Sequence, residues 1–160
     1  DGKIYDAYVI YPKSHTSEAN IVEYFVYQIL PDVLENECGY KLCIYGRDIC
    51  PGEGNAIEKG IQKSRRLIII LTLQSIHCED PAYDQHIAFY NALIQNDMKV
   101  ILLEMEAIGS YEKLQESLRY IIKQQGTIKW KEMPTGCPQS SNSKFWKHVR
   151  YHMPLAHKTS

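Results

Sequence analysis

The sequence predicts an α/β protein with an open, mostly parallel sheet and helices on both of its faces. Two observations support this fold class. Short runs rich in aromatic and β-branched residues alternate, along the whole chain, with segments whose apolar residues follow helical spacing. The most continuous apolar run, 66–72, is typical of a central parallel strand that is covered on both faces. Such an alternation implies right-handed crossovers between parallel strands.

The strands are recognised by their composition and their boundaries. The first run, 4–11, is rich in tyrosine and β-branched residues and lies between Gly2 and Pro12. Both sets of alternating residues in this run are largely apolar, so we expect the strand to be buried on both faces. The predicted strands, in chain order, are 4–11, 40–45, 66–72, 99–105 and 127–130.

The helices are recognised by apolar spacing and by the residues that end them. In the first helix, 18–36, Pro31 should kink or restart the helix because proline lacks the amide that the helical ladder needs. Gly39 should end that helix, and Gly126 should end the fourth. The remaining predicted helices are 55–64, 82–95, 110–124 and 142–153, the last opened by Asn142 or Ser143 as N-cap.

Length and composition indicate one domain. A chain of 160 residues with 44% apolar content fits a single hydrophobic core, so we expect one domain over 1–160, with its core at about 3–154 and a tail at 155–160. The longest purely apolar run, 67–71, is far shorter than the ~20 residues that span a bilayer. We therefore expect a soluble fragment, trimmed from a larger parent that could be a membrane protein.

Charge and cysteine usage exclude several classes of partner. With 18 basic and 19 acidic residues the formal charge is −1, which offers no strong overall field for a polyanion or an anionic membrane. We therefore expect neither nucleic acid nor direct membrane contact as a partner of this domain. The five cysteines contain no CxxC pair and no zinc-binding spacing, and we interpret them as reduced thiols in a cytosolic setting.

The segment GRDICPGEGN, 46–55, is the candidate functional loop. It follows the second predicted strand, and loops at the carboxyl ends of parallel strands carry function in this fold class. It contains neither GxGxxG nor GxxxxGK[ST], so a nucleotide-phosphate site is not indicated. The first and third strands end in Tyr11 and Thr72, which excludes a phosphoacceptor aspartate there. The residues around Cys50 do not match the GxSxG-like motif that surrounds a hydrolase nucleophile.

A metal site is not indicated either. His148 and His152 are spaced i, i+4, but the HExxH glutamate is missing, and Lys144, Lys147 and Arg150 lie on the same predicted helix. A solvated basic helix face explains this pattern better. We predict no metal and no cofactor.

Three sequence boxes resemble a known family. The segments YDAYVIY (5–11), GYKLCIYGRDICPG (39–52) and FW at Phe145 and Trp146 resemble, in order and spacing, the conserved boxes of the Toll/interleukin-1 receptor (TIR) domain. The resemblance extends from Asp1 to Pro154. Within the family, SRRLIIIL, GTIKW and SKFWKHVRYHMP resemble the cytoplasmic domains of interleukin-1 receptor chains rather than Toll-like receptors or adaptors.

The resemblance implies a fold and a function. It implies a flavodoxin-like, three-layer fold with strand order 2-1-3-4-5. It also implies a signalling scaffold at the cytoplasmic face of the plasma membrane, which binds the TIR domain of an accessory receptor chain and a cytosolic TIR adaptor to start inflammatory signalling. Weak self-association is a further expectation.

In the same resemblance, residues 46–55 match the family's BB loop, which contacts partner TIR domains. The implied partner-binding residues are Arg47, Asp48, Ile49, Cys50, Pro51, Gly52 and Glu53. A turn fixed by Pro51 and Gly52 would lower the ordering cost of binding. The alternative is structural: Arg47 and Asp48 pair with each other or cap the next helix.

The other two boxes are predicted to be structural. Tyr5, Asp6 and Ala7 lie in the first strand, and Phe145 and Trp146 are typical core anchors of a last helix. A buried Asp6 must be paired or hydrogen-bonded. We expect its partner to be an arginine of the segment 64–66.

An enzymatic function is the alternative. Some TIR domains hydrolyse NAD with a glutamate early in the third crossover helix, and the matching residue here is Asp84. Aspartate is one methylene shorter, and misplacing a catalytic group by about 1 Å can cost ~10²-fold in rate. The tryptophan of the WxxxE-like frame is also missing. We therefore interpret Asp84 as an acidic residue of the helix's first turn, with catalysis on NAD as the competing interpretation.

Overall fold

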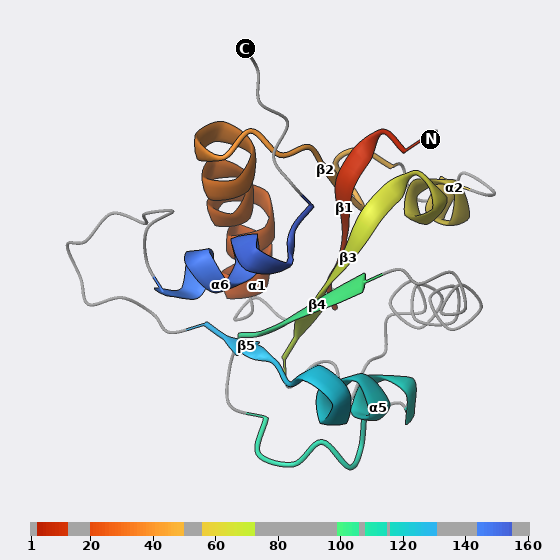
Figure 1. Ribbon diagram of the computed structural model, residues 1–160, viewed down its shortest axis with the longest axis vertical. Coiled ribbons are helices and arrows are strands. Elements are labelled where there is room, and N and C mark those ends of the chain that lie inside the picture. Colours follow the sequence, from red (N-terminus) through yellow and green to blue (C-terminus); the bar gives the residue numbers. More distant parts are fainter. Residues whose placement is uncertain are drawn as a thin grey trace.

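The computed structural model describes residues 3–12, 20–49, 56–72, 99–105, 108–114, 116–130 and 144–154. Within them five strands form one sheet in the order β2-β1-β3-β4-β5, and each neighbouring pair runs parallel (Figure 1). The strands are β1 (Tyr5–Ile10), β2 (Leu42–Ile44), β3 (Ser64–Leu71), β4 (Lys99–Glu104) and β5 (Ile128–Lys129). The predicted fold class and strand order are both confirmed.

The strands β1 to β4 begin at a common edge of the sheet. Tyr5 of β1 lies opposite Ser64 of β3, and Arg66 of β3 lies opposite Lys99 of β4. In Figure 1 the N-terminus lies at this edge, at the top of the view, where β1 and β3 both begin. Because the strands are parallel, their carboxyl ends meet at the other edge, where the loop after β2 leaves the sheet.

The residues of β1 divide alternately between two hydrophobic clusters, one on each face of the sheet. Ala7 and Val9 belong to one cluster, and Tyr8 and Ile10 belong to the other. All four residues are fully buried. The prediction that the first strand is covered on both faces is therefore confirmed.

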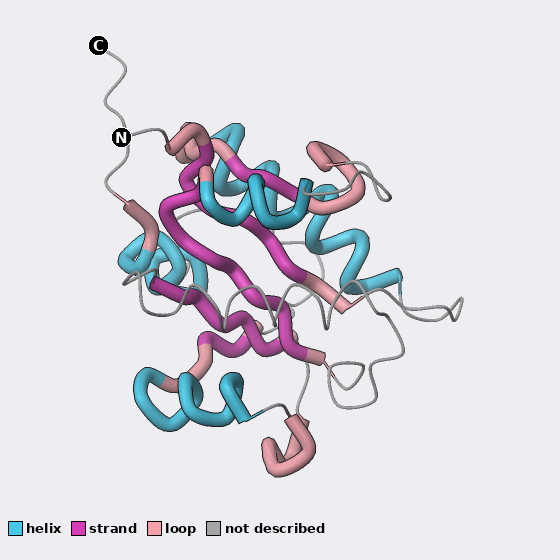
Figure 2. Tube along the Cα trace, turned by 90° about the vertical axis from the view of Figure 1, so that its right-hand side faces the viewer, coloured by secondary structure: helices cyan, strands magenta, loops and turns pink. Residues whose placement is uncertain are grey.

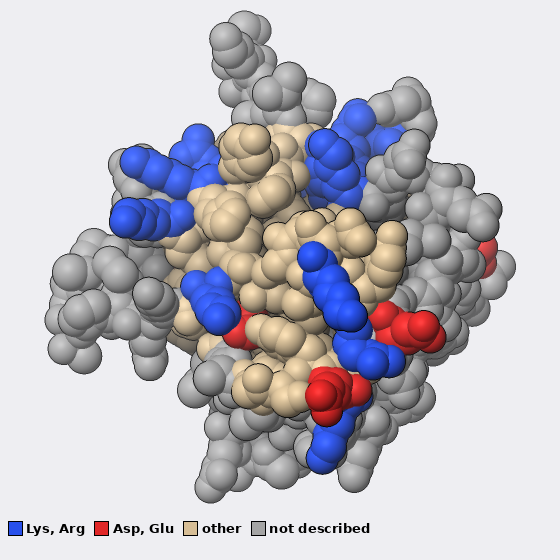
Figure 3. All heavy atoms as spheres, turned by 60° about the horizontal axis from the view of Figure 1, so that its bottom comes forward, with Lys and Arg blue, Asp and Glu red and all other residues tan. Residues whose placement is uncertain are grey.

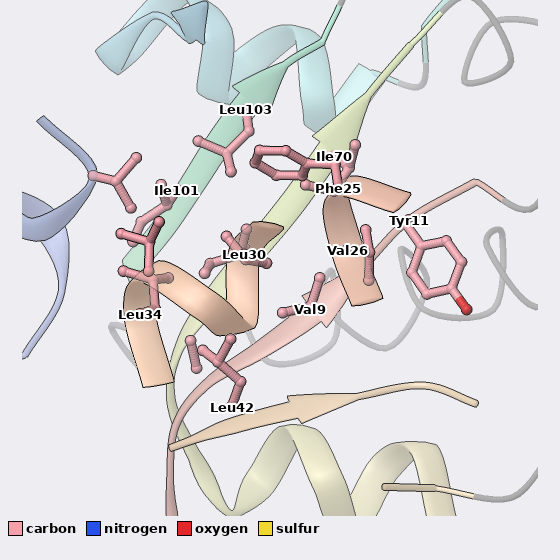
Figure 4. Packing of buried hydrophobic residues seen from close by; sticks show 14 of the residues in the cluster. Val9, Tyr11, Phe25, Val26, Leu30, Leu34, Leu42, Ile70, Ile101 and Leu103 are labelled. Carbon is pink, nitrogen blue, oxygen red and sulfur yellow. The ribbon is translucent and has the colours of Figure 1, made fainter. Parts of the chain in front are cut away.

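Helices cover both faces of the sheet, as Figure 2 shows. The helices are α1 (Asn20–Tyr24), η1 (Phe25–Ile29), η2 (Pro31–Glu37), α2 (Ala56–Gln62), α5 (Glu116–Gln125) and α6 (Lys144–His152). The segments α1, η1, η2 and α6 contribute to the cluster that contains Val9, while α2 and α5 contribute to the cluster that contains Tyr8. In Figure 4, Phe25, Leu30 and Leu34 lie with strand residues in the first of these clusters. None of the helices described is both long enough and apolar enough to cross a membrane.

The first helical segment changes its hydrogen-bond pattern around Pro31. The segments η1 and η2 are π-helical, and the N–H of Leu30 donates to the carbonyl of Phe25, five residues earlier. Proline has no N–H, and in an α-helix its ring clashes with the carbonyl four residues earlier. The wider π turn relieves that clash, and η2 begins at Pro31, so the predicted restart is confirmed. Gly39, with φ of 78°, follows its end.

One helix starts later than the sequence pattern predicts. The predicted helix 110–124 is observed only from Glu116, because residues 111–114 form a separate turn. The N–H of Leu114 donates to the carbonyl of Tyr111 at 3.1 Å, and the Tyr111 hydroxyl donates to the buried carboxylate of Glu104. That side-chain hydrogen bond holds Tyr111 outside the helix. The predicted helix 82–95 and the predicted N-cap Asn142 or Ser143 lie outside the described residues.

An aromatic cluster joins α6 to the rest of the core. Trp146 is fully buried and stacks on Phe25 of η1, with ring centroids 5.9 Å apart and planes 8° apart. Phe145 makes an edge contact with Trp130, which follows β5, at 4.9 Å between centroids. The predicted role of Phe145 and Trp146 as packing anchors agrees with this arrangement, and the flanking Lys144 and Lys147 are exposed.

Asp6 has a different partner from the one that the sequence predicts. Its Oδ2 accepts a hydrogen bond from the backbone N–H of Lys41 at 2.8 Å, and its own N–H donates to the Lys41 carbonyl at 2.7 Å. The expected partner was an arginine of 64–66: burial lowers the pKa of Arg66 and the charge of the Asp6 carboxylate opposes that lowering, but the Nε of Arg66 donates to the carbonyl of His152 at 3.0 Å. Asp6 therefore ties β1 to the residue before β2, and a backbone partner of this kind leaves no signal in the sequence.

Candidate functional site

The predicted docking loop begins as a tight turn at the end of β2. The backbone N–H groups of Arg47 and Asp48 both donate to the carbonyl of Ile44, at 3.0 and 2.8 Å. The N–H of Gly46 donates to the carbonyl of Ile49 at 2.9 Å, and Tyr45 and Ile49 form an isolated bridge. Gly46 has φ of 94°, a left-handed conformation that glycine adopts at little cost. The start of the loop therefore has one defined backbone conformation.

Arg47 connects this turn to the helix η2. Its Nη1 and Nη2 donate to Glu35 Oε1 and Oε2 at 2.8 and 2.9 Å, which is a two-pronged ion pair. Its Nε and Nη2 also donate to Asp48 Oδ2 at 3.0 and 2.9 Å. The guanidinium is planar, so two carboxylates bound at two of its edges fix its orientation. We call Glu35, Arg47 and Asp48 the loop-base triad.

The loop-base triad also closes the outer side of β2, which is an edge strand of the sheet. Glu35 Oε2 accepts the N–H of Leu42 at 3.2 Å, and Asp48 Oδ2 accepts the N–H of Ile44 at 2.8 Å. Arg47 Nη2 donates to the Leu42 carbonyl at 3.1 Å. Edge strands carry backbone groups that could pair with another chain, and here side chains bind them instead. The side chains that fix the start of the loop therefore also bind the outward-facing backbone groups of β2.

The environment of Arg47 keeps it charged. Hydrogen bonds to Glu35 raise the pKa of Arg47 above its ordinary value, and partial burial opposes that shift. The Arg47 side chain is 32% exposed, and those of Glu35 and Asp48 are 24% and 26% exposed. A partner that docks on this turn would meet a partly exposed charge cluster of one guanidinium and two carboxylates.

Two tyrosines hold the residue before the turn. The hydroxyls of Tyr11 and Tyr27 lie 2.9 and 2.8 Å from the carbonyl oxygen of Tyr45, and the two hydroxyls also contact each other. A Cβ added to Gly46 would lie 2.6 Å from the Tyr27 hydroxyl. Glycine at position 46 is thus required twice, by its φ angle and by this close approach.

Ile49 anchors the turn in the core. Only 8% of its surface is exposed, and it belongs to the cluster that contains Tyr8. A Cβ added to Gly60 of α2 would lie 2.5 Å from Ile49 Cδ1 and 2.7 Å from Tyr8 Cε2, so Gly60 allows the helix to approach the sheet. The resemblance implied that Ile49 contacts a partner, and in the structure its side chain also packs in the core beneath the turn.

The structure brings part of the predicted site together. Arg47, Asp48 and Ile49 form one turn, and the pairing of Arg47 with Asp48 that the structural alternative predicted is present. Nothing in the sequence pattern distinguishes Glu35 from other acidic residues on an exposed helix face. The predicted residues Cys50, Pro51, Gly52, Glu53 and Asp84 lie outside the described residues.

The histidine pair of α6 and the described cysteines show no arrangement that indicates a metal or catalytic site. The rings of His148 and His152 lie 5.3 Å apart, and burial, followed by the nearby His148 and Lys99, lowers the pKa of His152. Among the described residues, no group of three or more His, Cys, Asp or Glu side chains could hold a metal ion. Of the described cysteines, Cys38 and Cys43 are free thiols, and burial raises the pKa of Cys43 to about 12, so this thiol stays protonated.

Comparison with known protein families gives a match over most of the chain. Residues 7–160 match the TIR domain family. The chain is 58% identical to Interleukin-1 receptor-like 1 of Homo sapiens over 99% of its own length, and 47% identical to Interleukin-1 receptor type 1 of Homo sapiens over the same share. These alignments cover 30% and 29% of the two relatives, so the chain spans about a third of their length. The interleukin-1 receptor resemblance seen in the sequence motifs is confirmed.

Solved structures with the same fold are much more distant in sequence. The TIR domains of the activated Roq1 resistosome superpose with a TM-score of 0.52 at 10% identity, covering 76% of this chain and 72% of theirs. A metazoan TIR-STING receptor from C. gigas gives a TM-score of 0.51 at 19% identity, covering 74% of this chain and 34% of its own. These likenesses concern the fold alone.

Proposed function

The chain belongs to the TIR domain family, and from that premise we propose that it is the cytoplasmic signalling scaffold of an interleukin-1 family cytokine receptor. It acts at the cytoplasmic face of the plasma membrane by binding the TIR domain of an accessory receptor chain and a cytosolic TIR adaptor. The partner contact is made by the loop 46–55. The identity of 58% to an interleukin-1 receptor chain supports the receptor assignment.

The single observation that supports docking through this loop is the rigid loop-base triad. Ordering one flexible backbone residue costs roughly 1–2 kcal/mol, so a loop whose first residues are already fixed loses less free energy when it binds. Arg47 is held by two carboxylates, and the turn after β2 is closed by backbone hydrogen bonds. The loop therefore leaves the sheet in a defined direction, which a specific docking surface requires.

A weak contact is sufficient in this setting. Two receptor chains held side by side beneath a membrane have effective concentrations that reach about the millimolar range. A small interface then assembles when ligand brings the chains together and separates when they part. This is the physical reason to expect low affinity between the isolated domains, including weak self-association.

The competing function is NAD hydrolysis with Asp84 as the catalytic acid. One preparation tests both functions: the purified domain, free or clustered on beads, is assayed for capture of an adaptor TIR domain and for release of nicotinamide from NAD. We expect capture that increases on clustering, and no nicotinamide release. Release that rises on clustering and disappears in Asp84→Ala would contradict the scaffold proposal, as would a failure to capture any TIR partner.

A further inference from the structure

Basic side chains line the edge of the sheet at which the strands begin. Lys41 precedes β2, Lys63 precedes β3, and Lys99 is the first residue of β4. The register brings these positions together: the N–H groups of Ile4 and Tyr5 donate to the Lys63 carbonyl, and Asp6 bonds to Lys41. We call this edge the amino-end rim.

Neighbouring elements add more cations to the rim. Arg66 lies opposite Lys99 and binds the last turn of α6 through the His152 carbonyl. Arg150 of α6 lies close enough to Tyr40, next to Lys41, to oppose the rise that burial causes in the pKa of Tyr40. The cations of the amino-end rim are Lys3, Lys41, Lys63, Arg65, Arg66, Lys99 and Arg150.

Few described acidic groups offset this charge. Asp6 is only 6% exposed and bonds to the Lys41 backbone, and Glu37 lies at the end of η2 near Cys38. The third acidic group is Glu58 of α2, which accepts a hydrogen bond from the side chain of Gln62. Lys41, Lys63, Lys99 and Arg150 are all exposed to solvent. Among the described residues at this edge, basic side chains therefore outnumber acidic ones, although the overall charge of the chain is −1.

The face that carries α5 has a different charge pattern. In and before α5, Lys113, Arg119 and Lys123 alternate along the chain with Glu112 and Glu116. Figure 3, in which the bottom of Figure 1 comes forward, shows acidic residues close to several of the basic ones. A mixed surface of this kind attracts an anionic surface weakly, because opposite charges within a Debye length cancel.

We infer that the amino-end rim is a docking surface for an anionic lipid membrane. The inference rests on the proposed function for the presence of a membrane, and it departs from the sequence expectation of no direct membrane contact. Lys3, which precedes β1, is held at this edge because its Nζ donates to the carbonyl of Gln62 at 2.6 Å. Each basic residue near an anionic leaflet adds to the free energy of membrane binding. Several basic residues at one edge of the sheet therefore bind the membrane more strongly than a single one. Contact there would orient the opposite edge, with the loop 46–55, toward the cytosol.

The test uses the 160-residue chain and vesicles of two compositions at physiological ionic strength: phosphatidylcholine alone, or with roughly one third phosphatidylserine. We expect co-sedimentation with the phosphatidylserine vesicles only, and weaker binding as salt is raised. The triple variant Lys41→Glu, Lys63→Glu and Lys99→Glu is expected to bind roughly 100-fold more weakly.

The matched control is the triple variant Lys113→Glu, Arg119→Glu and Lys129→Glu, which changes the net charge by the same amount away from the amino-end rim; Lys129 lies opposite Glu104, the last residue of β4. It is expected to bind within about threefold of the wild type, because screening limits distant charges. Equal losses in both triples, or no binding by the wild type, would overturn the inference. Circular dichroism and thermal unfolding establish that each variant is folded.

Adaptor binding in solution separates this inference from the proposed function. The rim triple is expected to capture an adaptor TIR domain as the wild type does, since the loop 46–55 is at the other edge. Loss of adaptor capture in the rim triple, without vesicle binding by the wild type, would assign the rim to a protein partner and overturn the lipid inference. Vesicle binding without adaptor capture would support the rim and contradict only the proposed function.

Discussion

The variant Trp146→Ala is expected to lose about 3–5 kcal/mol of the free energy of unfolding. Trp146 is fully buried and stacks on Phe25, and it makes an edge contact with Phe145 at 4.9 Å between centroids. Its removal leaves a cavity between α6, η1 and β5 that these rigid rings cannot fill by small shifts. A loss of this size is a large part of the ~5–15 kcal/mol that stabilises a typical domain.

Urea denaturation followed by circular dichroism measures this loss. The control is Lys147→Ala, the next residue on the same helix, which is exposed and should change stability by less than about 0.5 kcal/mol. The comparison removes any effect of helix propensity common to both positions. A loss below about 1 kcal/mol in Trp146→Ala would show that α6 is not anchored by the aromatic cluster.

The variant Arg47→Ala is expected to lose about 2 kcal/mol of stability and to weaken partner binding. Removing the Arg47 guanidinium leaves the Glu35 and Asp48 carboxylates without their shared cation, while both remain bonded to the backbone of β2. Breaking hydrogen bonds to charged groups costs about 1.5–3 kcal/mol, and the partial exposure of all three side chains moderates the loss.

Arg47→Lys separates charge from geometry at this position. Lysine keeps the positive charge but cannot donate two parallel hydrogen bonds to Glu35. We expect it to recover about half of the stability lost in Arg47→Ala, measured by the same denaturation. Full recovery would mean that the guanidinium geometry contributes nothing, and no recovery would mean that the charge contributes nothing; either result would contradict the proposed role of the triad.

The sequence predicts the strands and helix ends of this fold well because each is encoded by residues that are close together in the chain. The run 66–72 needs only its own apolar residues to indicate a central strand, and β3 occupies the middle of the sheet. Gly39 and Gly126 both adopt positive φ where helix ends were predicted. Trp146 could be assigned to the core from its residue type and helical context.

The parts that the sequence does not predict depend on contacts between distant residues. Glu35 and Arg47 are 12 positions apart, and nothing in either segment indicates that they form a two-pronged pair. In the sequence Ile49 has the position of a loop residue, whereas in the structure it packs beside Gly60 and Tyr8. Tyr111 leaves its predicted helix because it reaches the buried Glu104. Each case is a tertiary contact that overrides a local pattern.

The central claim is that the loop 46–55 docks partner TIR domains, and Pro51→His tests it most directly. Proline fixes its own backbone, and histidine frees it, which adds roughly 1–2 kcal/mol of ordering cost to binding. The measurement is the dissociation constant for an adaptor TIR domain, with Pro154→His as a control that makes the same change outside the loop. We predict that Pro51→His binds at least about tenfold more weakly, with a melting temperature within about 4 °C of the wild type, and that Pro154→His binds normally. Unchanged affinity in a folded Pro51→His domain would contradict the claim.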